Sequence, residues 1–299
     1  MATGRFAPTP SADLHVGNLR TALVAWLFAR SSGSRFLMRV EDLDPRPDSR
    51  AVAERQLADL AALGLDWDGP VAHQSAHRAR HDEVLAELVA AGLTFPCYCT
   101  RREVREAAAA PHAPTGAYPG TCRALTVSER AAHEAAGRPA ALRLRSDGRS
   151  VTVHDRIHGT VTAVVDDIVL RRNDGVPAYH LAVVVDDHDQ GVEEVVRGDD
   201  LLDATPSQAH LCDLLGLARP TWAHVPLVLG PDGRRLAKRH GAVTLADLTV
   251  SGRTAGDVLA VLATSLGLVQ PREPAPLATL LDSFDPDELP REPWTWTPP

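Results

Sequence analysis

Lysine is almost missing from this sequence. Of the 31 lysine and arginine side chains, arginine supplies all except Lys238. Coding bias, which puts arginine wherever any positive charge suffices, is the simplest cause of this imbalance, and the alternative for the single lysine is accident. The single lysine then marks a position where a compact, mobile ammonium is favoured over a planar guanidinium.

Long apolar runs are absent as well. No uninterrupted apolar stretch approaches the roughly 20 residues that span a bilayer, and the N-terminus lacks a basic region followed by an apolar block. We therefore expect a cytoplasmic protein without membrane association. The 299 residues, 44% of them hydrophobic, can bury a full core in one large domain with an insertion or in two domains. The net charge of −8 argues against a protein coated in nucleic acid, but a local basic face could still hold a phosphate backbone.

Hydrophobic periodicity predicts an α/β protein. Leu19, Leu23 and Leu27 have the spacing of a buried helical stripe within residues 14–30. The run "RFLMRVED" is typical of a parallel strand covered on both faces, and it ends in the carboxylates Glu41 and Asp42, where open α/β sheets bind ligands. Further helices are predicted at about 49–63, 77–91, 199–216 and 254–266, and further strands at "VEEVVRG" and "HVPLVLG".

The middle of the chain follows another pattern. From about residue 96 to 119 it is rich in cysteine, proline and glycine, and "ALRLR", "VTVHD" and "GTVTAVVDDIVLRR" then alternate as half-exposed strands. We predict an α/β domain in two halves, 1–95 and 176–245, interrupted by an inserted α+β module at 96–175. A short helical segment and tail, 246–299, follow.

Cysteine is scarce, and three of the four cysteines lie in this module. Cys212 falls on an apolar helix face, as an inert core residue would. Cys97, Cys99 and Cys122 suggest one structural zinc ion, because a tetrahedral ion can order a segment without its own core. The spacing favours zinc over unlinked thiols. By general ligand preference, His112 and His133 are candidates for the fourth ligand.

Polar residues crowd the start of the first helix, in "RFAPTPSADLHVGN". Pro8 and Pro10 keep the chain extended, so that the first helical amides are expected to be uncovered and to form an anion site. His15 and Asn18 stand three residues apart on one helix face, where neutral donors can contact phosphate. A purely structural histidine is the alternative.

The lysine lies in a loop bounded by glycines, "PDGRRLAKRHGAV", after a buried strand. An enzyme that handles ATP would place a mobile phosphate clamp there. The alternative is a solvated basic loop.

Together these segments resemble the class I aminoacyl-tRNA synthetases. "HVGN", His15 to Asn18, matches their HIGH signature, and "RLAKR", Arg235 to Arg239, matches KMSKS in the same order. The blocks "RVEDLDPRP", "YHLAVVVDDHDQG", "VVRGDDLL" and "HVPLVLGPDGRRLAKRHG" resemble the glutamyl branch up to about residue 245. Ala237 stands where the family usually has serine, which puts a hydroxyl contact of the loop in doubt.

The resemblance implies a Rossmann-type parallel-sheet catalytic domain that uses ATP, with Mg²⁺, to form glutamyl-adenylate. His15, Asn18 and Lys238 would be catalytic and bind ATP. Glutamate would be bound by residues of the first strand and of later blocks, namely Arg5, Phe6, Ala7, Pro8, Thr9, Glu41, Tyr179 and Arg197. The family's Cys-x-Cys and Tyr-x-x-x-Cys pattern matches "CYC" and "YPGTC", which makes Tyr118 the fourth zinc ligand beside the three cysteines.

Only about 60 residues follow the lysine loop, fewer than the ~100 of a typical domain. We therefore expect no anticodon-reading domain. This pattern is similar to the glutamyl-Q tRNA(Asp) synthetases, which attach glutamate to the queuosine base in the anticodon of tRNA(Asp). A shortened glutamyl-tRNA synthetase that charges an acceptor end and a non-catalytic zinc-containing RNA-binding module are the alternatives. We expect a monomer.

Overall fold

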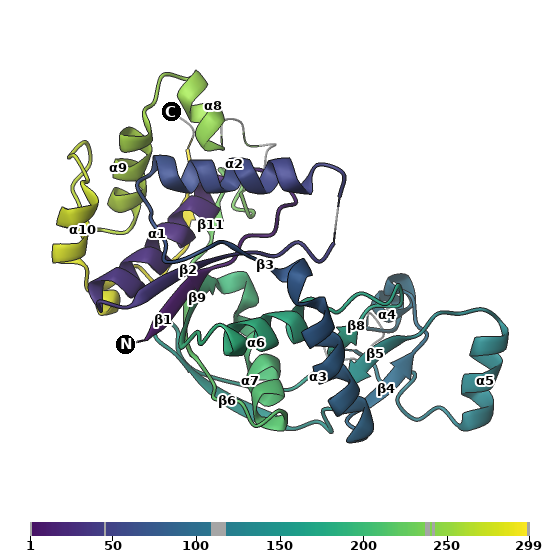
Figure 1. Ribbon diagram of the computed structural model, residues 1–299. Coiled ribbons are helices and arrows are strands. Elements are labelled where there is room, and N and C mark those ends of the chain that lie inside the picture. The colour runs from purple at the N-terminus through teal and green to yellow at the C-terminus, as the bar shows by residue number, and fades with distance from the viewer. Residues whose placement is uncertain (1, 45, 109–117, 237–239, 241–242, 298–299) are drawn as a thin grey trace.

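A seven-stranded sheet forms the centre of the computed structural model, which describes all residues except 1, 45, 109–117, 237–239, 241–242 and 298–299 (Figure 1). The strand order is β3-β2-β1-β9-β10-β6-β7. Neighbours from β3 to β6 are parallel, and β7 pairs antiparallel with β6. The strands are β1 (Thr3–Phe6), β2 (Arg35–Val40), β3 (Ala72–His73), β6 (Ser150–Asp155), β7 (Gly159–Val164), β9 (Glu194–Gly198) and β10 (Thr221–Val225). The expected parallel-sheet α/β fold is confirmed.

Helices cover both faces of this sheet (Figure 1). On one face α1 (Val16–Ser31) packs on β1 and β9, with α2 (Ser49–Ala62) nearby. On the other face α7 (Thr205–Leu214) packs on β6, and α6 (Tyr179–Asp189) lies between α7 and α3 (Arg78–Ala90). Short 3-10 helices, η1 (Gln74–His77) and η2 (Asp199–Ala204), precede α3 and α7.

Helix α1 is enclosed on nearly all sides. Every residue from Ala22 to Ala29 is buried, as expected of a helix that contacts protein all round. Its outer side meets α9 (Ala255–Ser265) and α10 (Leu277–Ser283), while α8 (Leu245–Val250) packs on α9. The C-terminal helices therefore share the main core.

The C-terminal tail returns to the sheet region. Strand β12 (Trp294–Thr295) pairs in parallel with β11 (Val228–Leu229), and a last 3-10 helix, η4 (Pro286–Glu288), precedes it. Trp296 is 4% exposed and belongs to the main core.

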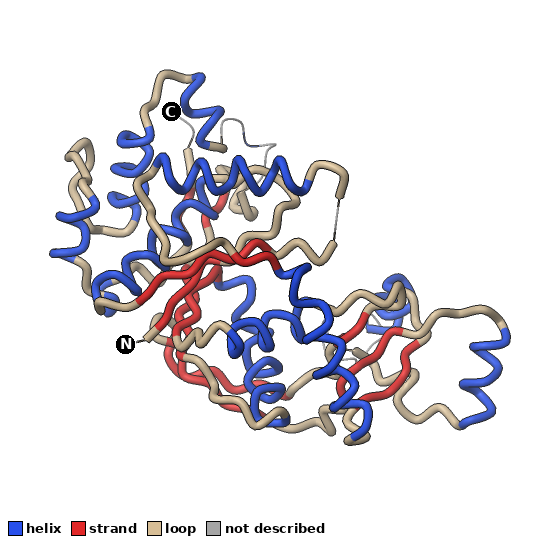
Figure 2. The backbone as a smooth tube through the Cα atoms, viewed as in Figure 1, coloured by secondary structure: helices blue, strands red, loops and turns tan. Residues whose placement is uncertain are grey.

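A smaller module stands apart from the main sheet, on the right of Figure 2. Its antiparallel sheet has the order β4-β5-β8, from β4 (Thr94–Cys97), β5 (Ala141–Leu144) and β8 (Val169–Arg171). Helices α4 (Arg101–Ala108) and α5 (Val127–Ala135) complete it.

Two features differ from the sequence expectation. Strands β6 and β7, expected within the inserted module, extend the main sheet, because Asp155 pairs with Trp222 of β10. Alternating burial predicts a strand but does not say which sheet it joins. The segment "HVPLVLG" is not one strand: β10 ends at Val225, and Pro226, which has no N–H, separates it from β11. The boundaries 1–95, 96–175, 176–245 and 246–299 stay a prediction.

Candidate active site

A cavity of about 480 Å³ lies at the carboxyl ends of β1, β2 and β9, where open α/β sheets bind ligands. The structure brings to its walls all the described residues that the sequence predicts for the amino acid and for ATP. They are Arg5, Phe6, Ala7, Pro8, Thr9, His15, Asn18, Glu41, Tyr179 and Arg197. Lys238 and Ala237 lie outside the described residues.

Arg5 is held from behind by a carboxylate of α6. Its Nε and Nη2 donate to the two oxygens of Asp187 over 3.2 and 3.3 Å, and Nη1 donates to the Val196 carbonyl oxygen over 3.3 Å. Burial raises the pKa of Asp187, but Arg5 and Arg39 outweigh it and leave that pKa below its ordinary value. Among the bonds to described residues, three of the five N–H donors of Arg5 are used, which leaves one on each terminal nitrogen.

Glu41 is anchored by a second buried arginine. Arg39, 0% exposed, donates to Glu41 Oε1 over 3.3 Å and forms a 2.7 Å ion pair with Asp187. The backbone N–H of Glu41 donates to the Pro8 carbonyl oxygen over 2.9 Å. Burial raises the pKa of Glu41 even though Arg39 and Arg5 lower it. A cationic group in the cavity would therefore favour the charged carboxylate.

Arg197 is buried, at 6% exposed, among neutral groups. Its Nε donates to His224 Nε2 over 3.0 Å, Nη1 to the Tyr179 hydroxyl over 3.3 Å and Nη2 to Thr205 Oγ1 over 2.9 Å. Burial is the main cause that lowers the pKa of Arg197. In the part of the chain that the structure describes, Arg197 forms no ion pair, and each terminal nitrogen keeps one N–H for a ligand.

His15 and Asn18 form a capping box at the start of α1. His15 Nδ1 accepts from the Asn18 backbone N–H over 3.2 Å, and Asn18 Oδ1 accepts from the His15 backbone N–H over 3.2 Å. His15 Nε2 and Asn18 Nδ2 are left as donors. Burial, followed by Arg235, lowers the pKa of His15 to about 4, so its ring is neutral near pH 7.

The sequence predicts uncovered backbone amides in the first turn of α1, but two of these amides are occupied by hydrogen bonds within the protein. The Val16 backbone N–H donates to the Val243 carbonyl oxygen over 2.7 Å, and the Asn18 N–H is used in the capping box. The side chains of His15 and Asn18, rather than these two amides, are thus left to face a ligand. The prediction is wrong at Val16 because a segment far along the chain accepts this hydrogen bond, and at Asn18 because the His15 side chain accepts it.

The described ends of the lysine loop adjoin the same cavity. The Leu236 N–H donates to the carbonyl oxygen of Val228, which lines the cavity, over 3.0 Å. At the other end, His15 and Thr244 form an antiparallel bridge. The loop that carries Lys238 therefore starts at the cavity wall and ends beside His15.

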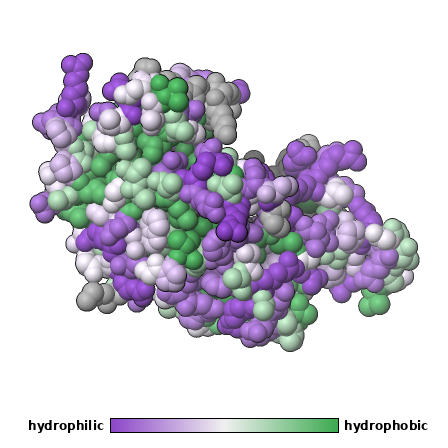
Figure 3. Space-filling model, turned by 45° about the horizontal axis from the view of Figure 1, so that its top comes forward, coloured by the Kyte–Doolittle hydropathy of each residue, from purple (hydrophilic) through white to green (hydrophobic). Residues whose placement is uncertain are grey.

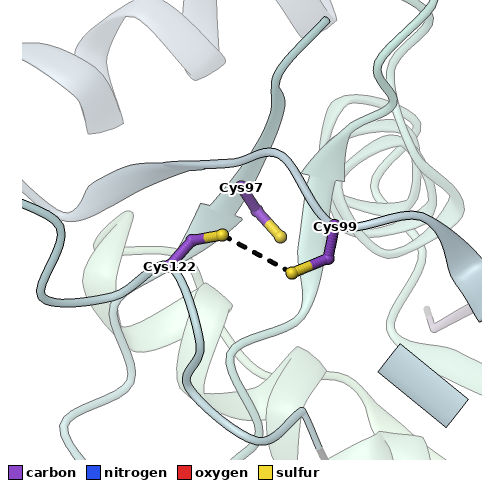
Figure 4. Close-up of side chains that lie close together, drawn as sticks. All are labelled: Cys97, Cys99 and Cys122. Atoms are coloured by element: carbon purple, nitrogen blue, oxygen red, sulfur yellow. Dashed lines mark hydrogen bonds between the residues drawn. The ribbon is translucent and has the colours of Figure 1, made fainter. Parts of the chain in front are cut away.

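Three cysteines of the small module converge, with their sulfur atoms pointing toward one another (Figure 4). The ligand atoms of Cys97, Cys99 and Cys122 all lie within 4.8 Å of one another, and Cys99 and Cys122 are 3.5 Å apart at Sγ. This is far beyond a disulfide bond and close to the ~3.8 Å between sulfurs that share a tetrahedral zinc ion with 2.3 Å bonds. The cluster can hold a metal ion such as zinc.

Tyr118 meets this cluster, whereas one predicted alternative does not. Its hydroxyl lies 3.3 Å from Cys97 Sγ and 4.0 Å from Cys99 Sγ, and it accepts from the Cys122 backbone N–H over 2.8 Å. The Arg143 guanidinium lies 3.8 Å from the centroid of the Tyr118 ring and can offset thiolate charge. His133 instead stacks on Tyr98, and His112 lies outside the described residues. Cys212 is buried on α7, away from the cluster.

A second, wider cavity, about 1220 Å³, adjoins the first and shares Thr9, Glu41 and Tyr179 with it. It extends to Cys97 and Cys99, so the two sites open on one region. Its wall also contains four arginines, which are Arg101, Arg105, Arg143 and Arg172. Glu41 and Asp44 also line this cavity, and Asp44 lies 3.4 Å from Arg172, but four arginines against two carboxylates leave the wall positively charged, which suits an anionic ligand.

Hydrophilic side chains are spread over the face of the molecule that Figure 3 shows. Among the described residues, no helix is both long and apolar enough to cross a membrane.

The fold and the site define a class of protein: the chain belongs to the family of class I tRNA synthetases (E and Q), catalytic domain, which it matches over residues 1–268. It is an aminoacyl-tRNA ligase-type enzyme with glutamate-tRNA-ligase-like function.

Particular relatives narrow this further. The chain is 61% identical to a glutamyl-Q tRNA(Asp) synthetase of Nocardia farcinica, over 98% of this chain and 93% of that protein. It is 47% identical to a protein of the same name from Symbiobacterium thermophilum, over 98% and 95%. Among solved structures, a glutamate tRNA ligase of Elizabethkingia meningosepticum in complex with its amino acid is 26% identical, with a TM-score of 0.83, over 99% of this chain and 67% of that one.

Sequence reasoning missed the residues that hold this site in place. Arg39 stands within an apolar strand two positions before Glu41, and a charge there signals a buried partner. Asp187 lies in the quoted block "YHLAVVVDDHDQG" and His224 in "HVPLVLGPDGRRLAKRHG", but neither was assigned a role. Asp155 Oδ2 lies 2.6 Å from Nδ1 of His224, which contacts Arg197. No local signal indicates this contact, because it depends on strand order.

Proposed function

We propose that this enzyme activates L-glutamate with ATP, without a need for tRNA in this step, and transfers the glutamyl group to the queuosine base in the anticodon of tRNA(Asp). One observation carries the first half: two buried arginines, Arg5 and Arg197, face one cavity that Glu41 also lines. Two cations and one anion around a small cavity complement the side-chain carboxylate and the ammonium of glutamate.

Each of the two guanidiniums has one N–H left on each terminal nitrogen. Two such N–H groups from one guanidinium can bind both oxygens of a carboxylate. Arg197 and Arg5 would therefore bind the side-chain carboxylate of glutamate, and Glu41 would bind its ammonium. The Tyr179 hydroxyl, Thr9 and the wall formed by residues 6–8 would complete the pocket.

Activation joins the amino acid to AMP. The α-carboxylate oxygen attacks the α-phosphorus of ATP, a P–O bond to the β-phosphate breaks, and pyrophosphate leaves with the electron pair. His15 Nε2 and Asn18 Nδ2 would donate to phosphate oxygens, and Lys238 would neutralise the charge that develops on them. ATP would enter with Mg²⁺. The main contribution of the chain is alignment of the two substrates.

The proposed acceptor is a hydroxyl of the queuosine base. Its oxygen attacks the carbonyl carbon of glutamyl-adenylate, an ester bond forms, and AMP leaves. The names of relatives that align over nearly the whole of both chains support this acceptor. The arginine-lined cavity beside the proposed glutamate pocket supports the binding of RNA there. An anionic anticodon loop would suit that cavity.

Two assays test the proposal. Glutamate-dependent ATP–pyrophosphate exchange should occur without tRNA, and radiolabelled glutamate should reach tRNA(Asp) with queuosine but not tRNA(Asp) without it. Equal transfer to both tRNAs would contradict the acceptor and favour charging of a terminal ribose. A folded protein that shows exchange only when tRNA is present would contradict tRNA-independent activation, and one that shows no exchange with or without tRNA would favour the non-catalytic RNA-binding module.

We also infer that the cysteine cluster holds one structural zinc ion, with Tyr118 as the fourth ligand. Zinc would tie β4, the segment around Tyr118 and the turn at Cys122 together. Metal analysis of Tyr118→Phe checks the fourth ligand, and zinc content should fall relative to the unmodified protein. Unchanged content would count against Tyr118.

A further inference from the structure

Strand β10 places a histidine directly beside Arg197. In the parallel pairing of β9 and β10, Arg197 and His224 are register partners. His224 is 0% exposed, and its Nε2 accepts from Arg197 Nε over 3.0 Å. The imidazole therefore takes up the side of the guanidinium that faces away from its two terminal nitrogens.

Asp155, at the end of β6, fixes the tautomer of this histidine. Its Oδ2 lies 2.6 Å from His224 Nδ1, so Nδ1 carries the proton and Nε2 keeps its lone pair for Arg197. Asp155 Oδ1 also accepts the backbone N–H groups of Ile157, His158 and His224 over 2.9 to 3.3 Å. This carboxylate is held in one orientation.

The hydroxyl of Thr205 contacts both Arg197 and His224. Thr205 Oγ1 accepts from Arg197 Nη2 over 2.9 Å and lies 3.1 Å from His224 Nε2. It donates to the Leu201 carbonyl oxygen over 3.1 Å. Arg197 is thus held at Nε and Nη2 by groups that carry no charge.

The charge of Arg197 is offset at a distance. A buried cation needs an anion nearby. Asp187 contacts Arg5 directly and also opposes, from a distance, the lowering of the Arg197 pKa. The carboxylate of Asp155 acts through the neutral His224 imidazole, which occupies only Nε of Arg197. Like Arg5, Arg197 keeps one outward N–H on each terminal nitrogen.

We propose that Asp155 and His224 are positioning residues that make Arg197 selective for the side-chain carboxylate of glutamate over the amide of glutamine. The proposal rests on the proposed function, in which Arg197 binds glutamate. Two outward N–H donors at a fixed position need two acceptor oxygens, which a carboxylate offers and an amide does not. Loss of Asp155 would free the imidazole to present N–H toward Arg197 Nε, where donor would face donor, and the guanidinium would turn away.

Asp155→Asn and His224→Phe test this in the full-length enzyme by glutamate-dependent ATP–pyrophosphate exchange. In each variant the KM for glutamate should rise roughly 10- to 100-fold, the range for loss of a hydrogen bond to a charged group. The KM for ATP should not change, and discrimination against glutamine should fall. His224→Gln, whose amide oxygen can reach the position of Nε2, should recover much of the loss.

Trp222→Phe is the matched control, because Trp222 is the register partner of Asp155 but belongs to a separate apolar cluster. It should loosen β6 against β10 without a change in the KM for glutamate. An equal rise in this control, or an unchanged KM in folded Asp155→Asn, would overturn the proposal. Should the Asp155 and His224 variants not fold, Thr205→Val decides in the same assay: a raised KM for glutamate supports the proposal and an unchanged one overturns it.

The variant Arg197→Gln distinguishes a failure of the positioning role from a failure of the proposed function, in which Arg197 binds glutamate. An unchanged KM for glutamate in that variant would refute the assignment of Arg197 to glutamate binding. A raised KM there, together with unaffected Asp155 and His224 variants, would leave the proposed function standing and refute only the positioning role.

Discussion

At the scale of single residues, the cavity depends on side chains whose free atoms are set by partners behind them. Asp187 uses two donors of Arg5, and the capping box uses Nδ1 of His15. In each case the hydrogen bond to the protein selects which atoms remain for a ligand. Such preorganisation lowers the entropy cost of binding.

Gly17 gives a prediction at this scale. A Cβ atom on Gly17 would lie 3.0 Å from Cε1 and Nδ1 of His15 and 3.3 Å from Cβ of Val228. Gly17→Ala should therefore displace the His15 ring and lower the rate of ATP–pyrophosphate exchange roughly 10- to 100-fold, since small misplacements of positioning groups are costly.

Gly256→Ala is its control. Gly256 is likewise the second residue of a helix, α9, but a Cβ there would meet only Thr254 Oγ1, at an ordinary 3.7 Å. This variant should keep full exchange activity and fold at least as stably, because alanine favours helix over glycine by about 1 kcal/mol. Full activity in Gly17→Ala would show that the ring is not so constrained.

At the scale of elements, the cavity is formed by several segments that lie far apart in the chain. Strands β1, β2 and β9 end at the cavity, and α1 starts there. Strand β11 lies between β12 of the C-terminal tail and the start of the lysine loop.

The small module has a core of few residues, namely Phe95, Cys97, Tyr98, Tyr118 and Cys122. Two of these are cysteines of the cluster, so a metal ion would supply much of its order.

Metal removal tests this at the same scale. Treatment with a chelator should make the module open to trypsin at arginines such as Arg101, Arg105 and Arg123. The fluorescence of the main body should not change, because all five tryptophans, Trp26, Trp67, Trp222, Trp294 and Trp296, lie outside the module. A fluorescence shift in step with proteolysis would mean that the ion, contrary to this expectation, supports the whole fold.

At the scale of the whole molecule, two half-buried histidines link stability to pH. Burial is the main cause that lowers the pKa values of His15 and His180 from 6.5 to about 4, with Arg235 and Arg197 adding to it. Between these values the unfolded chain binds protons that the folded chain does not. The contribution of each histidine is therefore complete above pH 6.5 and is lost as the pH falls toward 4.

His180→Asn measures one of these contributions. The lowering of the His180 pKa corresponds to a loss of about 3 kcal/mol at most in the free energy of unfolding as the pH falls from 6.5 to 4. The free energy of unfolding, measured in urea, should therefore fall less steeply over this range in the variant than in the unmodified protein. A measurement at pH 7.5 gives the baseline for the substitution itself. Parallel curves for the two proteins would contradict the prediction.

Much of this protein is determined by local sequence. Periodicity predicted a helix within 14–30 and a strand in 35–42, and the structure has them at 16–31 and 35–40, because side chains along an element report which of its faces is buried. The spacing of His15 and Asn18 placed both on one face of the first helical turn, and three cysteines in a loop-rich segment indicated a metal site. The order of these blocks was enough to indicate the family.

Only the tertiary structure decided which residues support the site. Asp155 meets His224 across 69 positions, and Arg5 meets Asp187 across 182. Both contacts depend on which strands are neighbours and in what register they pair. Local periodicity carries no information on this, since a strand such as β6 has the same alternation in the main sheet as it would have in the inserted module.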